Sequence, residues 1–402
     1  TGRTHDLHPT ASRTSDSSSM RASSTHDPNE TFNRVDPRAE GIRLWLSAPG
    51  TEARGGVETV LPDQKGFLMM TSREIRLKNR PVGMPIADDF ELGTVELPKP
   101  EAGQVQVRNV WMSVDPYMRG RMNDARSYVP PFALGAPMQG DAIGEVVLSN
   151  DPSFKPGDLV QSMFGWREAF NASANKVRKL ETHGLPAEAF LGVAGVPGLT
   201  AYVGLLHIAG LREGDVVFVS GAAGAVGSMV CQIAKLKGHK VIASAGGTEK
   251  AAFVRNELGA DETIDYKAVA DLTGAVAMAA PEGIDVYFDN VGGDHLDAAL
   301  ANAKTFGRFA LCGMISEYNV ASPQNGPRNL LMAVTKSLRL QGFVVLNHLN
   351  LQPAFAKDLA TWHAAGKIKW RQTVFHGVEQ APNAFLGLFK GKNIGKMLVK
   401  LS

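Results

Sequence analysis

Apolar and polar positions follow two different rhythms along the chain, and the change falls near residue 198. Before it, residues 105–110 alternate apolar and polar side chains, as a half-buried strand does. Residues 140–147 and 159–163 are also strand-like, and the glycines in the first of these runs suit a curved strand. Residues 71–197 are therefore predicted to form a compact, mostly β domain.

After Gly198, strand-like runs alternate with helix-like runs. The strand-like runs are residues 216–219, 241–243 and 286–288, and the helix-like runs are residues 229–235 and 250–258. This alternation is typical of a parallel, doubly wound sheet with right-handed crossovers, so the fold class is α/β. Beyond Gly342 we expect the chain to leave this sheet and its last segment to return to the first domain.

Residues 1–68 have a different composition, rich in Ser, Thr, Arg, Asp, His and Pro. A segment of this kind buries too little apolar surface to offset chain entropy, so disorder is the expectation. Scattered acidic residues argue against a transit peptide. We interpret residues 1–68 as a disordered or non-native leader before a working protein that begins near Met69 or Met70. The alternative is a targeting or partner-binding role.

Composition excludes several classes of function. A formal net charge of +2 gives no electrostatic case for nucleic acid or an anionic membrane. Residues 191–211 and 216–234 lack charged side chains, but glycines interrupt both runs, which favours buried core over a membrane span. Two cysteines are too few for a disulfide framework and fit a reducing cytoplasm.

The sharpest local motif is residues 220–227, Ser-Gly-Ala-Ala-Gly-Ala-Val-Gly, between a strand and a helix. Gly224 would let the backbone approach a pyrophosphate, and Gly227 would let helix and strand pack closely. The helix N-terminus presents N–H groups to the phosphates, so the candidate binding residues also include Ala223, Ala225 and Val226. Ala222 stands where the usual fingerprint has its first glycine. The alternative is a tight structural turn.

The second strand indicates which dinucleotide is bound. NAD-binding proteins usually carry an acidic residue at its end, to bind the ribose hydroxyls. Here the segment reads Ser244-Ala245-Gly246-Gly247-Thr248-Glu249-Lys250, without a carboxylate at the strand end. Gly246 leaves room and Lys250 could neutralise a 2′-phosphate, which favours NADPH. Alternatively, Lys250 is a solvated residue of the first helical turn.

The sequence does not provide the usual ligands of a catalytic zinc. Such sites commonly use three thiolate, imidazole or carboxylate ligands. Neither Cys231 nor Cys312 lies in the β domain, and Met138-Gln139-Gly140-Asp141 stands where a His-Glu pair is expected. We therefore expect no metal and disfavour a zinc-type alcohol dehydrogenase.

From residue 70 to the C-terminus, a series of motifs resembles one family, the zinc-independent medium-chain dehydrogenases/reductases of the prostaglandin/leukotriene reductase and curcumin reductase group. The motifs occur in the family's order around the glycine-rich loop. They are Arg80-Pro81-Val82-Gly83, Val114-Asp115-Pro116-Tyr117-Met118-Arg119-Gly120, Val196-Pro197-Gly198-Leu199-Thr200-Ala201-Tyr202, Asp289-Asn290-Val291-Gly292-Gly293, Cys312-Gly313-Met314-Ile315-Ser316-Glu317-Tyr318-Asn319 and Gly391-Lys392-Asn393-Ile394-Gly395-Lys396.

The resemblance implies a GroES-like β domain, residues 69–197 and 346–402, joined to a Rossmann domain, residues 198–345. It also implies a homodimer, with NADPH in the cleft between the domains. Carried over by motif, further cofactor-binding residues would be Met118, Thr200, Tyr266, Asn290, Cys312, Gly313, Phe343, Asn393 and Gly395. Several have structural alternatives: Cys312 and Phe343 as strand-end packing, Asn290 as a turn, and Asn393 as a helix cap or hairpin turn.

The implied activity is NADPH-dependent reduction of the carbon–carbon double bond of an enone or enal. Hydride on the β carbon leaves negative charge on the carbonyl oxygen, so the site must donate to that oxygen and later protonate the α carbon. A tyrosine hydroxyl suits both tasks. By analogy with the family Tyr318 is the first candidate, followed by Tyr117 and Tyr128. Alternatives are an NADPH quinone reductase and a non-catalytic NADPH-binding protein.

Overall fold

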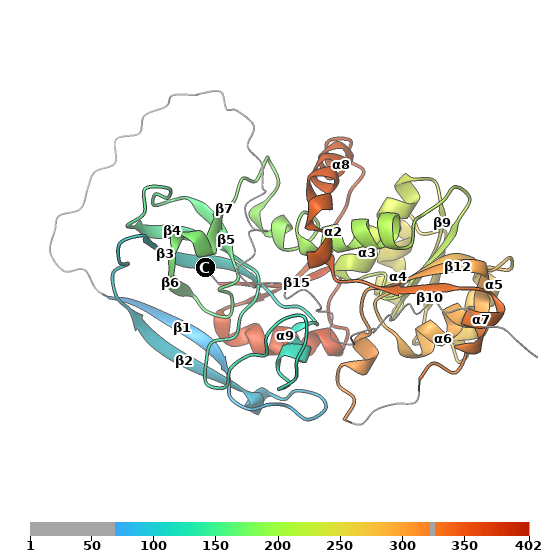
Figure 1. Ribbon diagram of the computed structural model, residues 1–402, viewed down its shortest axis with the longest axis horizontal. Helices are drawn as coiled ribbons and strands as arrows, with labels where there is room; N and C mark the ends of the chain where they lie inside the picture. The colour runs from blue at the N-terminus through green and yellow to red at the C-terminus, as the bar shows by residue number, and fades with distance from the viewer. Residues whose placement is uncertain (1–68, 322–325, 402) are drawn as a thin grey trace, which may run out of the picture. The chain divides into compact units, whose positions relative to one another are not determined.

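The computed structural model of the protein describes residues 69–321 and 326–401 (Figure 1). Predictions made for residues 1–68 therefore lie outside the described residues. The described residues form a seven-stranded sheet, a six-stranded sheet and a two-stranded ribbon. Among the helices of these two ranges, none combines the length and apolar character that crossing a membrane requires.

The seven-stranded sheet is mostly antiparallel and joins segments from both ends of the described chain. Its order is β14-β15-β3-β4-β5-β7, with β6 also paired to β3. Strand β15 pairs antiparallel with β3, so that Leu398 lies opposite Ser113, and β14 runs parallel to β15. The strands are β3 (Gln104–Ser113), β4 (Ala142–Ser149), β5 (Leu159–Ser162), β6 (Ala169–Ser173), β7 (Val177–Lys179), β14 (Gln372–His376) and β15 (Lys396–Lys400).

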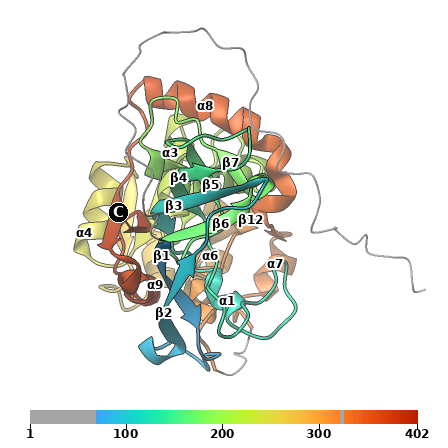
Figure 2. The ribbon, with the colours of Figure 1, turned by 90° about the vertical axis from the view of Figure 1, so that its left-hand side faces the viewer.

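An aromatic cluster packs the two-stranded ribbon against the helices of this part of the chain. The ribbon consists of β1 (Met70–Leu77) and β2 (Phe90–Leu97), and the helices are α1 (Met118–Arg121) and α9 (Ala381–Phe389) (Figure 2). Trp166 is fully buried, stacked 6.1 Å from the Phe90 ring and edge-on to Phe385 at 5.9 Å. The same cluster encloses Met118.

The six-stranded sheet confirms the predicted doubly wound fold. Its strands are all parallel, in the order β10-β9-β8-β11-β12-β13. This is the 3-2-1-4-5-6 order of dinucleotide-binding sheets, whose ligands bind at the carboxyl ends of the strands. The strands are β8 (Val216–Val219), β9 (Lys240–Ala245), β10 (Glu262–Asp265), β11 (Ile284–Asp289), β12 (Ala303–Leu311) and β13 (Arg339–Gly342).

Successive side chains of these strands enter two separate cores, because a strand alternates its side chains between the two faces of the sheet. Val217 and Val219 pack on the side of α2 and α3, whereas Phe218 packs on the side of α5 and α6. In Figure 1, α3 and α6 accordingly lie on opposite sides of the sheet. The helices are α2 (Val196–Tyr202), α3 (Ala225–Leu236), α4 (Thr248–Asn256), α5 (Leu272–Ala279), α6 (Gly293–Asn302), α7 (Leu331–Thr335) and α8 (Gln352–Ala364).

Short helical turns connect many of these elements. One follows α2 directly and is a π-helix, a form often found at functional sites. They are the 3₁₀ turns η1 (Ala87–Asp89), η2 (Ala174–Lys176), η3 (Ala187–Leu191), η5 (Ile315–Glu317), η6 (Val345–Leu351) and η7 (Val378–Gln380), and the π-helix η4 (Val203–Ile208).

Candidate active site

The glycine-rich loop between β8 and α3 is shaped by three glycines. Gly221 has φ +59° and accepts from Gly224 N–H at 2.9 Å, so the tight turn depends on Gly221. Ala222, which stands at the usual first-glycine position, does not need that conformation. A Cβ at Gly227 would lie 2.4 Å from Gly221 O, so only glycine lets α3 start this close to β8. Helix α3 begins at Ala225, and its first N–H groups face the end of the sheet.

The C-terminal loop closes against this phosphate loop. Gly395 N–H donates to Ala223 O at 2.7 Å, and Gly395 itself has φ +67°. A Cβ at Gly395 would lie 1.9 Å from Arg371 O, so this position requires glycine as well. Asn393 Nδ2 donates to Gly395 O at 2.9 Å and thus holds the loop in shape. Of the two predicted residues of this segment, Gly395 therefore meets the phosphate loop directly, and Asn393 supports it.

The turns after β9 and β10 come together around Gly246. A Cβ at Gly246 would lie 2.7 Å from the Tyr266 hydroxyl, so the tyrosine ring covers this glycine closely. Asp265 Oδ1 accepts from Gly247 N–H at 2.7 Å and from Lys267 N–H at 3.1 Å, which ties the two turns together. The predicted residues Gly246 and Tyr266 are therefore neighbours.

Two lysines bring positive charge to these turns. Lys250 Nζ donates to Gly391 O at 2.7 Å, so it is not simply solvated. Burial lowers the pKa of Lys250, and the charge of Lys267 lowers it further. Two like charges held close together favour the arrival of an anion. Sequence reasoning missed Lys267, although it follows directly after Tyr266 in the chain.

A buried carboxylate organises the loop after β11. Asp289 Oδ1 accepts from the Tyr287 hydroxyl at 2.7 Å and from the N–H groups of Val291 and Gly292 at 2.9 and 2.8 Å. The Ser220 hydroxyl donates to the same oxygen at 3.1 Å, which joins the ends of β8 and β11. Burial raises the pKa of Asp289, and these hydrogen bonds oppose that shift. Sequence reasoning assigned no role to Asp289.

Asn290 lies at the same edge of the sheet. Its Nδ2 donates to Ser220 O at 2.7 Å, and its backbone N–H donates to Ser220 Oγ at 2.9 Å. These contacts are those of a structural turn, the alternative considered for this residue. Because the turn stands at the carboxyl ends of β8 and β11, it also borders the ligand-binding edge of the sheet.

A pocket of about 480 Å³ opens at the carboxyl ends of β12 and β13. Its lining includes three residues predicted to contact the cofactor, Cys312, Gly313 and Phe343. The Phe343 ring lies edge-on to Phe288 at 6.3 Å and reaches the π-helix, where a Cβ at Gly204 would be 2.6 Å from it. Burial raises the pKa of Cys312 to about 12, so this thiol stays protonated at neutral pH.

Tyr318 follows η5 and stands beside this pocket. Its hydroxyl would lie 3.0 Å from a Cβ on Gly313, so a side chain at that position would crowd the tyrosine. Burial raises the pKa of Tyr318, whereas a hydrogen bond from the Met314 backbone opposes the shift. The charges of Cys312 and Tyr128 also act on the hydroxyl, which places these groups in its surroundings.

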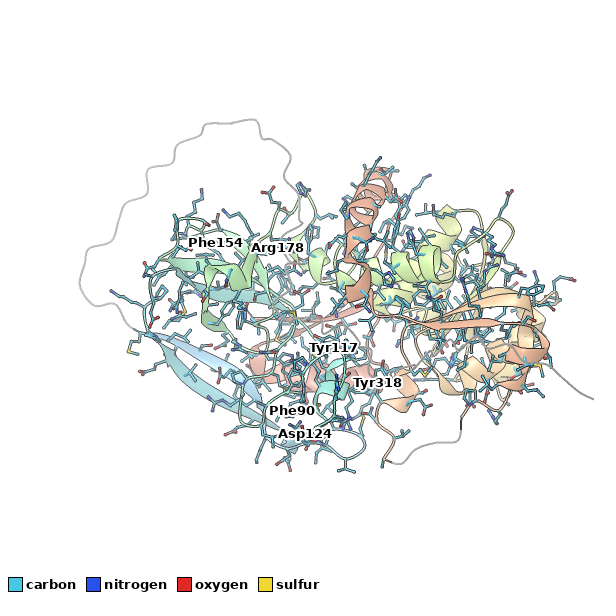
Figure 3. All side chains as sticks on the ribbon, viewed as in Figure 1. Phe90, Tyr117, Asp124, Phe154, Arg178 and Tyr318 are labelled. Atoms are coloured by element: carbon cyan, nitrogen blue, oxygen red, sulfur yellow. The ribbon has the colours of Figure 1, made fainter. Side chains whose placement is uncertain are left out.

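Tyr117 and Tyr128 come from the segment around α1. Burial raises the pKa of Tyr117 strongly, with a further contribution from Asp115. Tyr128 is 59% exposed, yet partial burial and nearby Cys312 raise its pKa. Figure 3 shows Tyr117 at the start of α1 and Tyr318 in the segment after β12. Electrostatic interactions link the Tyr128 side chain to those of Tyr117 and Tyr318, and a site shared by all three tyrosines stays a prediction.

Two predicted cofactor contacts have buried side chains. Met118 is fully buried, and a Cβ on Gly140 would lie 2.4 Å from its methyl group. Thr200 is 8% exposed, and its hydroxyl donates to Val196 O at 2.8 Å. These side chains pack under α1 and within α2, so their contact with a cofactor stays a prediction.

An arginine that sequence reasoning missed connects the tyrosine segments. Arg119 is 3% exposed and donates from Nε to Asn319 Oδ1 at 3.0 Å. It also donates to Gly83 O at 2.8 Å and to Asn123 Oδ1 at 2.6 Å. Asn319 follows Tyr318, so one guanidinium ties that segment to α1. The signal was present in the motif that contains Tyr117.

The residues at the expected zinc position form hydrogen bonds with neighbouring side chains. Gln139 Oε1 accepts from Arg121 at 2.9 Å, and Gln161 Nε2 donates to both carboxylate oxygens of Asp141 at 2.8 and 2.7 Å. Burial raises the pKa of Asp141 to about 7. Within residues 69–321 and 326–401, no three His, Cys, Asp or Glu side chains are placed to hold a metal ion.

Comparison with known proteins agrees with this geometry. Residues 73–180 match the family described as the N-terminal domain of oxidoreductase, and residues 225–362 match zinc-binding dehydrogenase. The chain is 41% identical to the NADP⁺-dependent 2-alkenal reductase of Nicotiana tabacum, with 83% of this chain and 98% of that protein covered. It is 40% identical to the NADPH-dependent curcumin reductase of Escherichia coli (strain K12), with 81% and 96% covered.

A solved structure, CurA from Vibrio vulnificus in complex with NADPH, has the same fold. Its TM-score is 0.78 at 41% identity, over 82% of this chain and 99% of that one. Sequence and fold therefore agree with the resemblance found in the motifs. The chain belongs to the NADP-dependent oxidoreductases of the medium-chain dehydrogenase/reductase family, in the group that contains the curcumin and 2-alkenal reductases.

Proposed function

We propose that this protein uses NADPH to reduce the carbon–carbon double bond of α,β-unsaturated ketones and aldehydes. The observation that carries the proposal is the position of the Tyr318 hydroxyl beside Gly313 in the pocket wall, together with the electrostatic interactions that link Tyr128 to Tyr318 and to Tyr117. The related 2-alkenal and curcumin reductases support the same class of substrate.

The residues present fit NADPH. A pyrophosphate would lie at the N-terminus of α3, against Ala223, Gly224, Ala225, Val226 and Gly227. The close approach of loop and helix there leaves little room for a Cβ at Gly224 or Gly227, which would lie 3.2 and 2.4 Å from Gly221 O. Lys250, Lys267 and Tyr266 would hold the 2′-phosphate beside Gly246, because the two cations there lie near one another. Asn290, Cys312, Gly313, Phe343, Asn393 and Gly395 would border the ribose and nicotinamide.

When bound, the dihydronicotinamide supplies a hydride to the β carbon. The protein must then stabilise the charge that develops on the carbonyl oxygen. The Tyr318 hydroxyl accepts from the Met314 backbone, so its own proton is available for donation to that oxygen. The raised pKa keeps Tyr318 protonated at neutral pH, which is the state a donor requires.

Tyr117 supports the same chemistry from the other side of the site. Its raised pKa also keeps it protonated, so it can donate a hydrogen bond without introducing charge. Tyr128 is the most exposed of the three and stands on the loop after α1, where it would contact the distal part of the substrate. Tyr318 is therefore the principal donor, and Tyr117 and Tyr128 orient the substrate.

The proposed reaction requires no metal. Polarisation of the carbonyl is assigned to Tyr318, and the side chains of Gln139 and Asp141 are engaged with Arg121 and Gln161. Treatment with a chelator and dialysis should therefore leave turnover unchanged. Recovery of activity only after Zn²⁺ is added back would reject the metal-free mechanism.

A cofactor-oxidation assay separates the proposed function from its alternatives. Purified protein is given NADPH with a series of enals, enones and quinones, and NADH serves as the cofactor control. We expect NADPH-dependent turnover of enals and enones, with much weaker use of NADH. Turnover of quinones alone would assign a quinone reductase, and binding of NADPH without turnover would assign a non-catalytic protein.

A homodimer is the proposed assembly. Strand β13 is the outer strand of the six-stranded sheet, so within the described residues one of its edges has no partner strand. Exposed apolar side chains occur at Leu331 (66%), Val334 (75%) and Phe306 (68%). A second copy paired along β13 would cover such a surface, since open strand edges and apolar patches favour association.

Two further assignments are proposals of the same kind. Residues 69–197 with 346–402 form the catalytic domain and residues 198–345 the cofactor domain, in line with the two sheets. A reducing cytoplasm suits a protein whose two cysteines are both free.

A further inference from the structure

We infer that Lys396 is a positioning residue that holds the Tyr117 segment in register with the phosphate loop. The inference concerns the active site described above and rests on the proposed function.

Lys396 is an unusually buried lysine. It opens β15 and is only 5% exposed, whereas lysines are almost never buried unless they are paired. Its Nζ donates to Val114 O at 3.2 Å and to the carboxylate of Asp115. Both partners belong to the short segment that leads to Tyr117.

Asp115 connects Lys396 to residues on both sides of Tyr117. Its carboxylate also accepts from the Ser113 hydroxyl, and its backbone oxygen accepts from Met118 N–H at 3.1 Å. The segment from Ser113 to Met118 is thus held by side-chain and backbone contacts on both sides of Asp115. Tyr117 lies inside it, where Pro116 further restricts the backbone.

On its other side, Lys396 is joined to the phosphate loop. The preceding residue, Gly395, donates to Ala223 O at 2.7 Å. The aliphatic stem of Lys396 lies 3.5 Å from a Cβ position at Gly192, in the segment that leads into α2. A cavity of about 10 Å³, lined in part by Lys396, Ala225 and Ser228, leaves room for one water at most. A displacement of the Lys396 side chain would therefore shift both the segment around Tyr117 and the phosphate loop.

Stability alone does not explain this ion pair. Replacing a buried ion pair with apolar residues of similar volume is often neutral or stabilising. A fold that needed only packing here would accept a neutral side chain. The charged lysine instead fixes the direction of two acceptor atoms, one on Asp115 and one on Val114.

The test is Lys396→Met, which keeps the length of the stem but removes the donors. We expect kcat for an enone to fall about 10²-fold, as small misplacements of a catalytic group can cause. The Kd for NADPH, measured by fluorescence, should stay within about threefold of the wild-type value, because the Gly395 backbone contact remains. Hydrogen exchange should become faster in peptides that cover residues 113–122.

The matched control is Arg308→Met. Arg308 forms a comparably buried ion pair with Asp215, which precedes β8, at the end of the sheet opposite the pocket. This variant should lose stability without changing kcat or exchange in residues 113–122. If Lys396→Met alone fails to fold, the double variant Asp115→Asn with Lys396→Met removes the uncompensated charge and should show the same fall in kcat.

The outcomes divide clearly. Wild-type kcat and unchanged exchange in Lys396→Met, or in the double variant, would overturn the inference. An equal fall of kcat in Arg308→Met would also overturn it, because the effect would then be general destabilisation. If the wild-type protein reduced no enone, the proposed function would fail, and the exchange comparison would still decide the role of Lys396.

Discussion

Tyr318 shows how the chemistry of this site depends on individual residues. Its hydroxyl lies close to Gly313, where a Cβ would crowd it at 3.0 Å, and burial raises its pKa and so keeps the proton on the oxygen. The neighbouring Asn319 is held by Arg119, a residue 200 positions earlier in the chain. The proposed donor is thus fixed by groups that are assigned no part in the reaction, which is the arrangement that preorganised catalysis requires.

The first prediction concerns the Tyr318 hydroxyl. Tyr318→Phe should lower kcat by about 10²–10³-fold, the usual effect of removing one donor to a developing oxyanion. The Kd for NADPH should stay nearly unchanged. Tyr202→Phe is the matched control, since it removes a hydroxyl that bonds Asp358 at 3.0 Å, away from the pocket. Steady-state kinetics with wild-type turnover in Tyr318→Phe would remove Tyr318 from the mechanism.

The second prediction concerns Asp141. Its pKa is raised to about 7, chiefly by burial, from an ordinary value of about 3.9. Between about pH 4 and 7 the folded state therefore binds a proton that the unfolded state releases, so this group makes stability fall as the pH rises. Asp141→Asn has no ionisable group at this position, so its unfolding free energy should not show this decrease with pH.

Urea unfolding at pH 4.5, 6 and 8 tests this. The unfolding free energy of Asp141→Asn minus that of the wild type should increase with pH, by more than about 1 kcal/mol. Taking this difference cancels the contribution of all other groups. A difference that stays constant across the three pH values would show that Asp141 titrates normally.

At the scale of elements, the turns at the carboxyl ends of the strands make the site. Ala222 N–H in the β8–α3 loop donates to Ser244 O in β9 at 2.9 Å, and Gly247 N–H after β9 donates to the Asp265 carboxylate at the end of β10, so these turns are tied together. The charge of Lys250 and Lys267 is held on two of these turns. Cofactor preference is therefore a property of the turns together.

The third prediction follows from that charge. Lys250→Ala should raise the KM for NADPH by about tenfold or more, because a charge-assisted hydrogen bond is worth about 1.5–3 kcal/mol. The KM for NADH should change much less, since NADH has no 2′-phosphate. The KM for NADH, measured on the same variant, therefore serves as the control. Equal increases for both cofactors would mean that Lys250 acts through its bond to Gly391 O and not through the phosphate.

These elements also show how far prediction from sequence reaches. The strands of the parallel sheet are continuous apolar runs, so residues 216–219 and 286–288 could be recognised from pattern alone. Gly227 could be assigned because the glycine that lets helix and strand pack closely stands at a fixed position within the glycine-rich motif. The glycine with positive φ is Gly221, one position before the usual first glycine of the motif, where this chain has Ala222. The sequence pattern alone does not show which of the two residues adopts the positive φ.

Other parts of the site could not be predicted because they depend on contacts between distant segments. The bond from Arg119 to Asn319 and that from Lys396 to Asp115 join residues about 200 and 281 positions apart. Asp289 looked like part of a turn motif, and its bond to the Ser220 hydroxyl follows only from the meeting of β8 and β11. Local patterns carry no information about such pairings.

For the whole molecule, the open edge at β13 leads to the proposed dimer. The Leu331→Glu, Val334→Glu double variant should be monomeric, because two carboxylates would be buried in the contact. Met278→Glu is the control, since Met278 is 79% exposed on α5, away from β13. Sedimentation velocity distinguishes the species. A wild-type monomer, or a double variant that stays dimeric, would reject this interface.

The central claim, hydride transfer to the β carbon of an enone, can be measured directly. The protein is incubated with an enone and NADPH that carries deuterium on nicotinamide C4, and the product is analysed by mass spectrometry and NMR. Separate reactions use the two deuterium epimers, so that either face of the nicotinamide can be detected. We predict a saturated ketone with one deuterium on the β carbon from one of the epimers. An allylic alcohol with deuterium on the former carbonyl carbon, or unchanged enone, would contradict the account.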